Sequence, residues 1–144
     1  MAIELEKVRG LLSDTVLELV DLIGWHSTAR LIERLGGCSF IVSQENNRSD
    51  SKRTDVLKKY LSENDVKLIQ KQYGGETIYI PRCYSALRAL RNQSFIADYD
   101  RLIKTGESQR FILMKLCPEY GISDRWAQRI ISESGDSKRQ MSLL

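Results

Sequence analysis

A glycine pair that runs directly into a short β-branched segment constrains the fold of this chain more than any other feature. Residues 74–82 read GGETIYIPR. Glycine ends helices, and the β-branched and aromatic run after this pair predicts a strand over residues 76–80. Pro81 lacks a backbone donor, so it ends the strand or places it at a sheet edge. Because a lone strand leaves its backbone groups unsatisfied, this segment needs a second strand as its partner.

The same plan occurs earlier in the chain. Gly36 and Gly37 follow a helix-forming stretch and precede CSFIV, which predicts a second short strand over residues 38–42. Aligning the two glycine pairs brings apolar residues into register: Leu31 with Ile69, Leu35 with Tyr73, Phe40 with Ile78, and Val42 with Ile80. Each unit reads helix, helix, Gly-Gly, strand. The repeat suggests that two such strands pair antiparallel, either within one chain or between two chains.

Helical periodicity dominates the rest of the sequence, so we expect a mainly α fold with one short antiparallel β-ribbon. Apolar residues recur at helical spacing over 3–23, 27–35, 56–73 and from 84 onward, with breaks at Gly24 and at 105–107. Residues 1–81 are expected to form one helical region, with a polar linker over 43–53. Residues 82–134 are expected to form a second helical domain, and residues 135–144 a flexible tail.

The segment LCPEYGISDRWAQRII, residues 116–131, has the pattern of a helix-turn-helix. Gly121 can take the positive φ that a tight turn between two helices requires. Apolar residues on both sides of the turn can pack the two helices together. Ser123 or Asp124 can cap the second helix.

Two residues depart from the simplest form of this pattern. Pro118 lacks the N–H that the last turn of the first helix uses, so we expect that helix to end early, at Leu116 or Cys117. Trp126 fits two roles, since it could pack on Leu113 or touch DNA. We favour packing.

The second helix of this pattern would expose side chains that suit DNA: Asp124, Arg125, Gln128 and Arg129. Arginine binds O6 and N7 of guanine in a bidentate fork, and glutamine binds N6 and N7 of adenine. Ser123 and the helix N-terminus can hold a phosphate. From residue 82 onward the chain has 11 basic and seven acidic residues, which suits phosphate contacts, and we add Arg82 and Lys115 to the predicted DNA-binding set. We therefore expect residues 82–134 to form a helix-turn-helix DNA-binding domain. An ordinary helical hairpin with a solvated, charged face is the alternative.

Other chemistry has little support in this sequence. His26 is the single histidine and the three cysteines are widely spaced, so we predict no metal site, no cofactor and no catalytic residue. The acidic pairs Glu4/Glu6 and Asp98/Asp100 fit a solvated helix face better than a metal site. The sequence shows neither a signal peptide nor a membrane-spanning run, which predicts a cytoplasmic protein without a membrane segment.

The glycine–strand segment and the helix-turn-helix together resemble the Mor transcription activator family, named for the middle-operon activator of phage Mu. DLIGWHSTARLIERLGG also resembles its helical dimerisation region, and the other matching residues are Gly74, Gly75, Tyr79, Ile80, Pro81, Arg82, Tyr120, Gly121, Ile122 and Ser123. The resemblance implies a homodimer in which residues 1–81 form the dimerisation region. It implies hinges at Gly74, Gly75 and Pro81, and strands near the minor groove, with contacts from Thr77 and Tyr79. Each helix-turn-helix would read one half of an inverted-repeat site.

The resemblance further implies a phage or prophage activator that is associated with the nucleoid and contacts the alpha and sigma subunits of RNA polymerase. Two features depart from the family pattern. The helix-turn-helix begins later after Pro81, as though helix had been inserted around 95–105, and the first unit duplicates the second. Which unit supplies the dimer strand is therefore left open. A repressor, an architectural dimer or a non-activating interaction protein could use the same fold.

Overall fold

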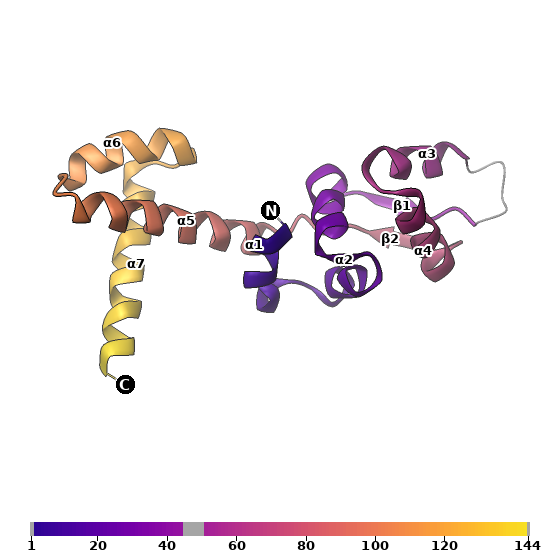
Figure 1. Cartoon of the computed structure of the whole chain (residues 1–144), viewed down its shortest axis with the longest axis horizontal. Coiled ribbons are helices and arrows are strands. Elements are labelled where there is room, and N and C mark those ends of the chain that lie inside the picture. The colour runs from indigo at the N-terminus through magenta and orange to yellow at the C-terminus, as the bar shows by residue number, and fades with distance from the viewer. Residues whose placement is uncertain (1, 45–50, 144) are drawn as a thin grey trace. The chain divides into compact units, whose positions relative to one another are not determined.

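The structure is a computed structural model that describes residues 2–44 and 51–143 (Figure 1). These residues form seven α-helices, one short 3-10 helix (η1) and a two-stranded antiparallel sheet, which confirms the predicted mainly α fold with a short β-ribbon. The order is α1 (Ala2–Lys7), η1 (Arg9–Leu11), α2 (Asp14–Leu35), β1 (Ser39–Ile41), α3 (Ser51–Tyr60), α4 (Glu63–Tyr73), β2 (Thr77–Tyr79), α5 (Tyr84–Lys104), α6 (Gln109–Tyr120) and α7 (Asp124–Leu143). The chain divides into two compact units, residues 1–87 and 88–144.

The N-terminal part of the first unit contains more breaks than the periodicity of residues 3–23 suggested. Helix α1, η1 and the first half of α2 occupy this stretch, and the hydroxyl of Ser13 accepts a hydrogen bond from Val16 N at 3.5 Å to begin α2. Gly24 interrupts α2 with φ of 86° and ψ of 170°, so the expected break there is a kink inside one long helical segment. Helix α1 packs against α2, and its Leu5 is fully buried.

The two glycines of each pair meet two different requirements at the turn from helix to strand. A Cβ atom on the first glycine, Gly36 or Gly74, would lie 2.5 Å from the carbonyl oxygen four residues earlier. The second glycine has positive φ, 86° at Gly37 and 85° at Gly75, where residues with a Cβ are strained. Both turns therefore need Gly-Gly, which explains why the pair recurs in the sequence.

Replacing Gly75 with valine is expected to lower the free energy of unfolding of the first unit by about 1–2 kcal/mol, the cost of a left-handed backbone at a residue with a Cβ. The matched control is Gly10→Val, because a Cβ at Gly10 meets nothing within 4 Å and its φ lies outside the strained range. Urea unfolding of both variants provides the measurement. An equal effect in the two variants would contradict this account of the turn.

The ribbon forms within one chain, which answers the alternative that the repeat left open. Strands β1 and β2 pair antiparallel, with Phe40 opposite Ile78, and with Ser39–Tyr79 and Ile41–Thr77 on either side. Ile78 is buried and Phe40 is half-buried, whereas the flanking residues of both strands are exposed. One face of the ribbon therefore covers the core of the first unit, and the other face is open to solvent.

Three predicted boundaries differ in the structure. Of the polar linker expected over 43–53, residues 45–50 lie outside the described residues, and 51–53 belong to α3, which the buried Leu57 anchors. The described residues of the expected tail continue α7 as far as Leu143, because a glycine such as Gly135 costs a helix only about 1 kcal/mol. The two units meet after residue 87 instead of residue 81, since Ala86 is fully buried and belongs to the first unit.

The second unit packs α5, α6 and α7 around one apolar core. Phe95 of α5 is fully buried at its centre, and its ring meets that of Tyr120 edge-on with centroids 5.5 Å apart. The other buried members come from α6 and α7: Ile112, Leu113, Leu116, Cys117, Ala127 and Ile130. This core fixes α6 and α7 relative to each other.

The early end of α6 expected at Leu116 or Cys117 is wrong. Helix α6 includes Pro118 and ends at Tyr120. A proline in the last turn removes one backbone donor but leaves the following carbonyls available. Beyond it, Gly121 N bonds to the carbonyl oxygens of Cys117 and Pro118, and Ile122 N donates to the Cys117 oxygen at 3.1 Å. These bonds close the helix end and compensate for the lost donor.

Candidate nucleic-acid interface

Helices α6 and α7 are joined by a tight turn with the expected chemistry. Gly121 has φ of 64° and ψ of 35°, the left-handed conformation that a glycine adopts without strain. Ser123 Oγ accepts a hydrogen bond from Trp126 N at 3.1 Å and so caps α7. Of the two predicted caps, Ser123 fills the position, and Asp124 is the first residue of the helix.

One face of α7 gathers the four side chains predicted to meet DNA. Asp124, Arg125, Gln128 and Arg129 are all exposed, and positions 125, 128 and 129 share one helix face because they lie three and four residues apart. The opposite face carries Ala127 and Ile130 of the core. The polar face is therefore held on a helix whose other side is fixed by packing.

Trp126 and Arg129 are coupled on this helix. Trp126 is half-buried against the core of the second unit, which agrees with the packing role favoured from the sequence. The Arg129 guanidinium lies 5.3 Å from the centre of the Trp126 ring, and its Nε donates to Glu133 at 3.1 Å. Because both charged side chains are about two-thirds exposed, this ion pair adds little stability but orients Arg129.

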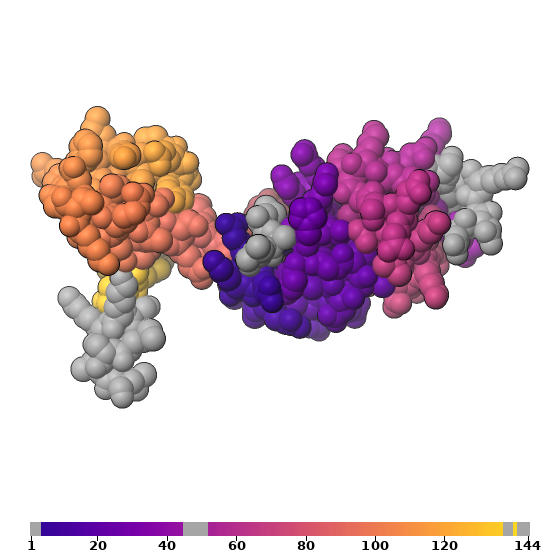
Figure 2. Space-filling view, in the orientation of Figure 1, coloured from indigo at the N-terminus to yellow at the C-terminus, as the bar shows by residue number. Residues whose placement is uncertain are grey.

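Helix α6 contributes the other side of the same surface. A hollow of about 600 Å³ lies between the two helices, with Arg110, Met114 and Pro118 of α6 facing Asp124 and Gln128 of α7. The second unit's surface, including α6, is drawn in orange to yellow in Figure 2. Met114 is 79% exposed, which is high for so large an apolar side chain. Arg110 and Met114 were not among the DNA-binding residues predicted from the sequence. They lie four residues apart in the helix that Ser108 caps, so their spacing could have placed them on one helix face.

Lys115 also lies on α6 and is exposed. Its positive charge helps to lower the pKa of the Asp98 carboxyl group on α5. It belongs to the same unit as the polar face of α7. The structure therefore places Lys115 in the unit that carries most of the predicted DNA-binding residues.

Three predicted DNA-binding residues lie in the first unit. Thr77 and Tyr79 are exposed on β2, where they lie opposite Ile41 and Ser39 of β1. Ile41 and Ser39 are exposed as well, but they were not among the DNA-binding residues predicted from the sequence. The repeat was the signal that could have found them, because it aligns Ser39 with Thr77 and Ile41 with Tyr79. Arg82 Nη1 donates to the Tyr84 hydroxyl at 2.8 Å. These residues and the α7 face belong to different units.

The predicted hinge residues also lie in the first unit. Gly74 and Gly75 connect α4 to β2, where Gly75 N donates to the Val42 carbonyl oxygen at 2.8 Å. Pro81 lies between β2 and α5. The glycine pair is thus part of the turn that leads from α4 into β2. Of the three predicted hinge residues, only Pro81 lies in the segment that connects β2 to α5.

The sequence model of the Mor transcription activator family matches residues 29–143 of the 144. The chain belongs to this family. The match contains both glycine pairs, both strands and the α6–α7 pair. Searches of the curated proteins and of the solved structures returned no match.

Membership identifies the chain with transcription activators and not with an enzyme family. Within residues 2–44 and 51–143 of this Mor family member, no cluster of three or more histidine, cysteine or acidic side chains could hold a metal ion. The helices of those same ranges include none with the length and apolar character needed to cross a membrane.

A hydrogen bond to α5 fixes the end of α6 in this Mor family member. The Tyr120 hydroxyl donates to the Asp98 carboxylate, which also accepts from Arg101 Nη2 at 3.2 Å. The bond from Tyr120 is the main reason that the pKa of Asp98 lies below its usual value. Burial, followed by the bond to Asp98, raises the pKa of Tyr120 to about 12. The contact therefore joins a neutral hydroxyl to a carboxylate over a wide pH range.

Replacing Tyr120 with phenylalanine keeps the ring against Phe95 and removes the hydroxyl. We expect the second unit to lose about 1 kcal/mol of stability at neutral pH, a typical net value for one hydrogen bond, because Asp98 stays partly hydrated. Thermal unfolding of the variant and the parent protein gives this difference. A difference near zero would mean that the hydroxyl does not fix the end of α6.

The same contact predicts how the stability depends on pH. Because the folded-state pKa of Asp98 is lowered, its contribution is complete above the unfolded-state value of about 4 and is lost as pH falls through the folded-state pKa. Because the pKa of Tyr120 is raised, its contribution is complete below an unfolded-state value of about 10 and is lost as pH rises through about 12. The stability difference between the parent and Tyr120→Phe should therefore shrink in acid, which unfolding curves over a pH series can test. A constant difference would contradict this prediction.

Proposed function

We propose that this Mor family member binds double-stranded DNA in a sequence-specific manner through α6 and α7, acting as a helix-turn-helix, and activates transcription from the bound promoter. The observation that carries the proposal is the exposed face formed by Arg125, Gln128 and Arg129. That face lies on a helix that a cap and a buried core hold in place. Such rigid support is what base reading in a major groove requires.

Each side chain of the interface suits a particular DNA group. Arg125 and Gln128 stand one turn apart and match the hydrogen-bonding edges of guanine and adenine. Arg129, which contacts Trp126 and Glu133, suits either a base or a phosphate. Lys115 and Arg110 on α6 suit phosphates, which set the register of a helix in the groove without reading sequence.

The finer expectations from the family resemblance remain predictions. They include contact with the alpha and sigma subunits of RNA polymerase, residence in the cytoplasm with the nucleoid, and a phage or prophage origin. They also include minor-groove contacts by Thr77 and Tyr79. The exposure of both strand residues supports the minor-groove contact. The resemblance also implies a homodimer on an inverted-repeat site, which would need an interface other than the ribbon, because β1 and β2 pair within one chain.

Footprinting tests the proposed function most simply. The purified full chain is applied to DNA that flanks its own gene, over a series of salt concentrations, and transcription from the protected promoter is measured with and without the protein. We expect a discrete protected site, affinity that falls steeply with salt, and increased transcription. Protection without increased transcription would indicate a repressor or an architectural protein. Absence of any protected site would favour an interaction protein instead.

A further inference from the structure

The two halves of the first unit are related by an internal two-fold. Gly74 follows Gly36 by 38 positions, so residues 14–43 and 52–81 are counterparts. Backbone hydrogen bonds between the halves come in pairs with the roles exchanged. Gly37 N donates to the Ile80 carbonyl oxygen, and its counterpart Gly75 N donates to the Val42 carbonyl oxygen. In the same way, Ile80 N donates to the Cys38 carbonyl oxygen, and its counterpart Val42 N donates to the Glu76 carbonyl oxygen.

Residues that meet their own counterparts mark the two-fold axis. Phe40 lies directly opposite Ile78 in the ribbon, and these two residues are 38 positions apart. Ser27 Oγ donates to Asp65 Oδ2 at 2.6 Å, and these residues are counterparts as well. Only residues at a two-fold axis can contact their own counterparts, so the axis passes both through the ribbon and between α2 and α4.

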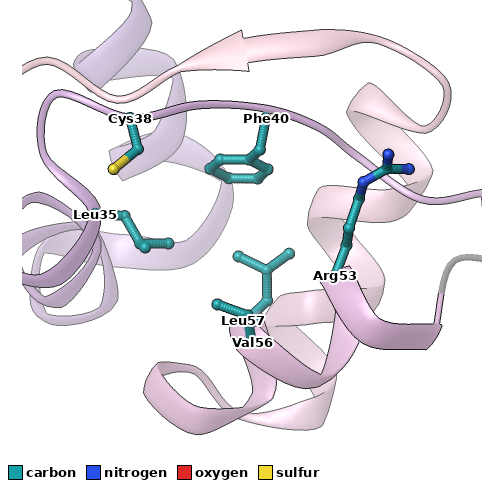
Figure 3. Close-up of a pocket in the computed structure, with 6 residues that line it drawn as sticks. All are labelled: Leu35, Cys38, Phe40, Arg53, Val56 and Leu57. Carbon is teal, nitrogen blue, oxygen red and sulfur yellow. The ribbon is translucent and has the colours of Figure 1, made fainter.

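The helices also pack across the axis in matched positions. In Figure 3 the side chains around a hollow of about 180 Å³ come from both halves: Leu35, Cys38 and Phe40 from the first, and Arg53, Val56 and Leu57 from α3 of the second. At the matched position the Tyr73 hydroxyl donates to the Glu18 carboxylate at 3.3 Å. Tyr73 and Glu18 are the counterparts of Leu35 and Val56. Each half therefore lays its first helix against the end of the other half's second helix.

The outward faces of the two halves differ in polarity. In the first half Val16 and Ile32 are buried on α2, the helix against which α1 packs. Their counterparts in the second half are Thr54 and Gln70, which hydrogen-bond to each other at 3.2 Å. The second half thus presents polar groups where the first half has a covered apolar face.

We propose that the first unit is a pseudo-dimer within one chain, and that the protein is a monomer with a single α6–α7 pair that binds a non-palindromic DNA segment. A two-fold interface uses the same patch on both partners, so it is complete once the two patches have met. Here both patches belong to one chain. The DNA part of this inference rests on the proposed function, whereas the pairing part does not.

The mass of the full chain in solution tests the pairing part. Sedimentation equilibrium over a wide concentration range is expected to give the mass of one chain, 16.6 kDa, with no dependence on concentration. A mass that rises to that of two chains would overturn the proposal.

A cross-link distinguishes pairing within a chain from an exchange of strands between chains. Ser39→Cys and Tyr79→Cys place two thiols directly opposite on the exposed face of the ribbon, in a background where Cys38, Cys83 and Cys117 are serine. On mild oxidation the double variant should form a disulfide and run as a single chain. An equimolar mixture of the two single variants should form no covalent dimer. A covalent dimer in that mixture would overturn pairing within the chain.

The number of chains on the footprinted DNA tests the remaining part. We expect one chain per protected site, measured by the mass of the protein–DNA complex. Two chains bound to an inverted repeat would overturn the proposal that the protein binds DNA as a monomer. Failure to bind any DNA would contradict the proposed function and the DNA part together, and a single-chain mass would still support the internal pairing.

Discussion

Replacing Phe95 with alanine is expected to lower the free energy of unfolding of the second unit by about 3–5 kcal/mol, the usual range for a fully buried phenylalanine. Phe95 is fully buried and its ring contacts those of Tyr99 and Tyr120, so truncation leaves a cavity between α5 and the other two helices. A loss of this size is a large part of the stability of a typical domain. The variant should therefore lose DNA binding along with the packing that holds α6 and α7.

The control for this variant is Phe111→Ala, the same substitution at an exposed site. Phe111 is 51% exposed on α6, so its truncation removes little buried surface. Urea unfolding followed by circular dichroism gives both stabilities, and we expect a much smaller loss for Phe111→Ala. Similar losses in the two variants would show that Phe95 is not the centre of the core.

Replacing Arg125 with alanine is expected to weaken specific DNA binding by about 1–3 kcal/mol, or roughly 5- to 150-fold in Kd, if this residue makes a bidentate base contact. Arg125 is exposed on the face opposite Ala127, so the variant should remain folded. The loss should be confined to sites with the matching base pair. Titration of fluorescent duplexes that differ at single positions measures both the affinity and the base preference.

Lys115→Ala provides the matched comparison for Arg125→Ala. Lys115 is exposed on α6 and suits a phosphate, so its removal should weaken binding to all sequences about equally. The slope of log K against log salt should fall by about 1 for Lys115→Ala. If Arg125→Ala also weakened all duplexes equally, α7 would not be reading bases through this residue.

Local chemistry made several features predictable from the sequence. Positive φ at Gly121 and the Ser123 cap follow from turn and cap preferences that act over four residues. The Gly-Gly repeat predicted both strands, and the structure adds the reason for each glycine of the pair. The α7 face follows from helical spacing, since Ala127 and Ile130 must turn inward.

Features that depend on packing were not predictable in this way. Pro118 stays inside α6 because Gly121 and Ile122 supply bonds beyond it, and such compensation is not visible in a proline position alone. The repeat could not say whether β1 pairs with β2 of the same chain or of another, because the same edge groups are satisfied in either case. Ser27 and Asp65 meet only after the two halves have folded onto each other.

Selection of bound duplexes from a random pool tests most directly whether α7 reads DNA sequence. The full chain and Arg125→Ala are each used to enrich binding sequences over the same number of rounds. We predict a defined motif for the parent protein and a loss of preference at one base pair for Arg125→Ala. Enrichment of no motif by the parent protein, or of an identical motif by both proteins, would contradict the assignment of α7 and Arg125 as the reading element.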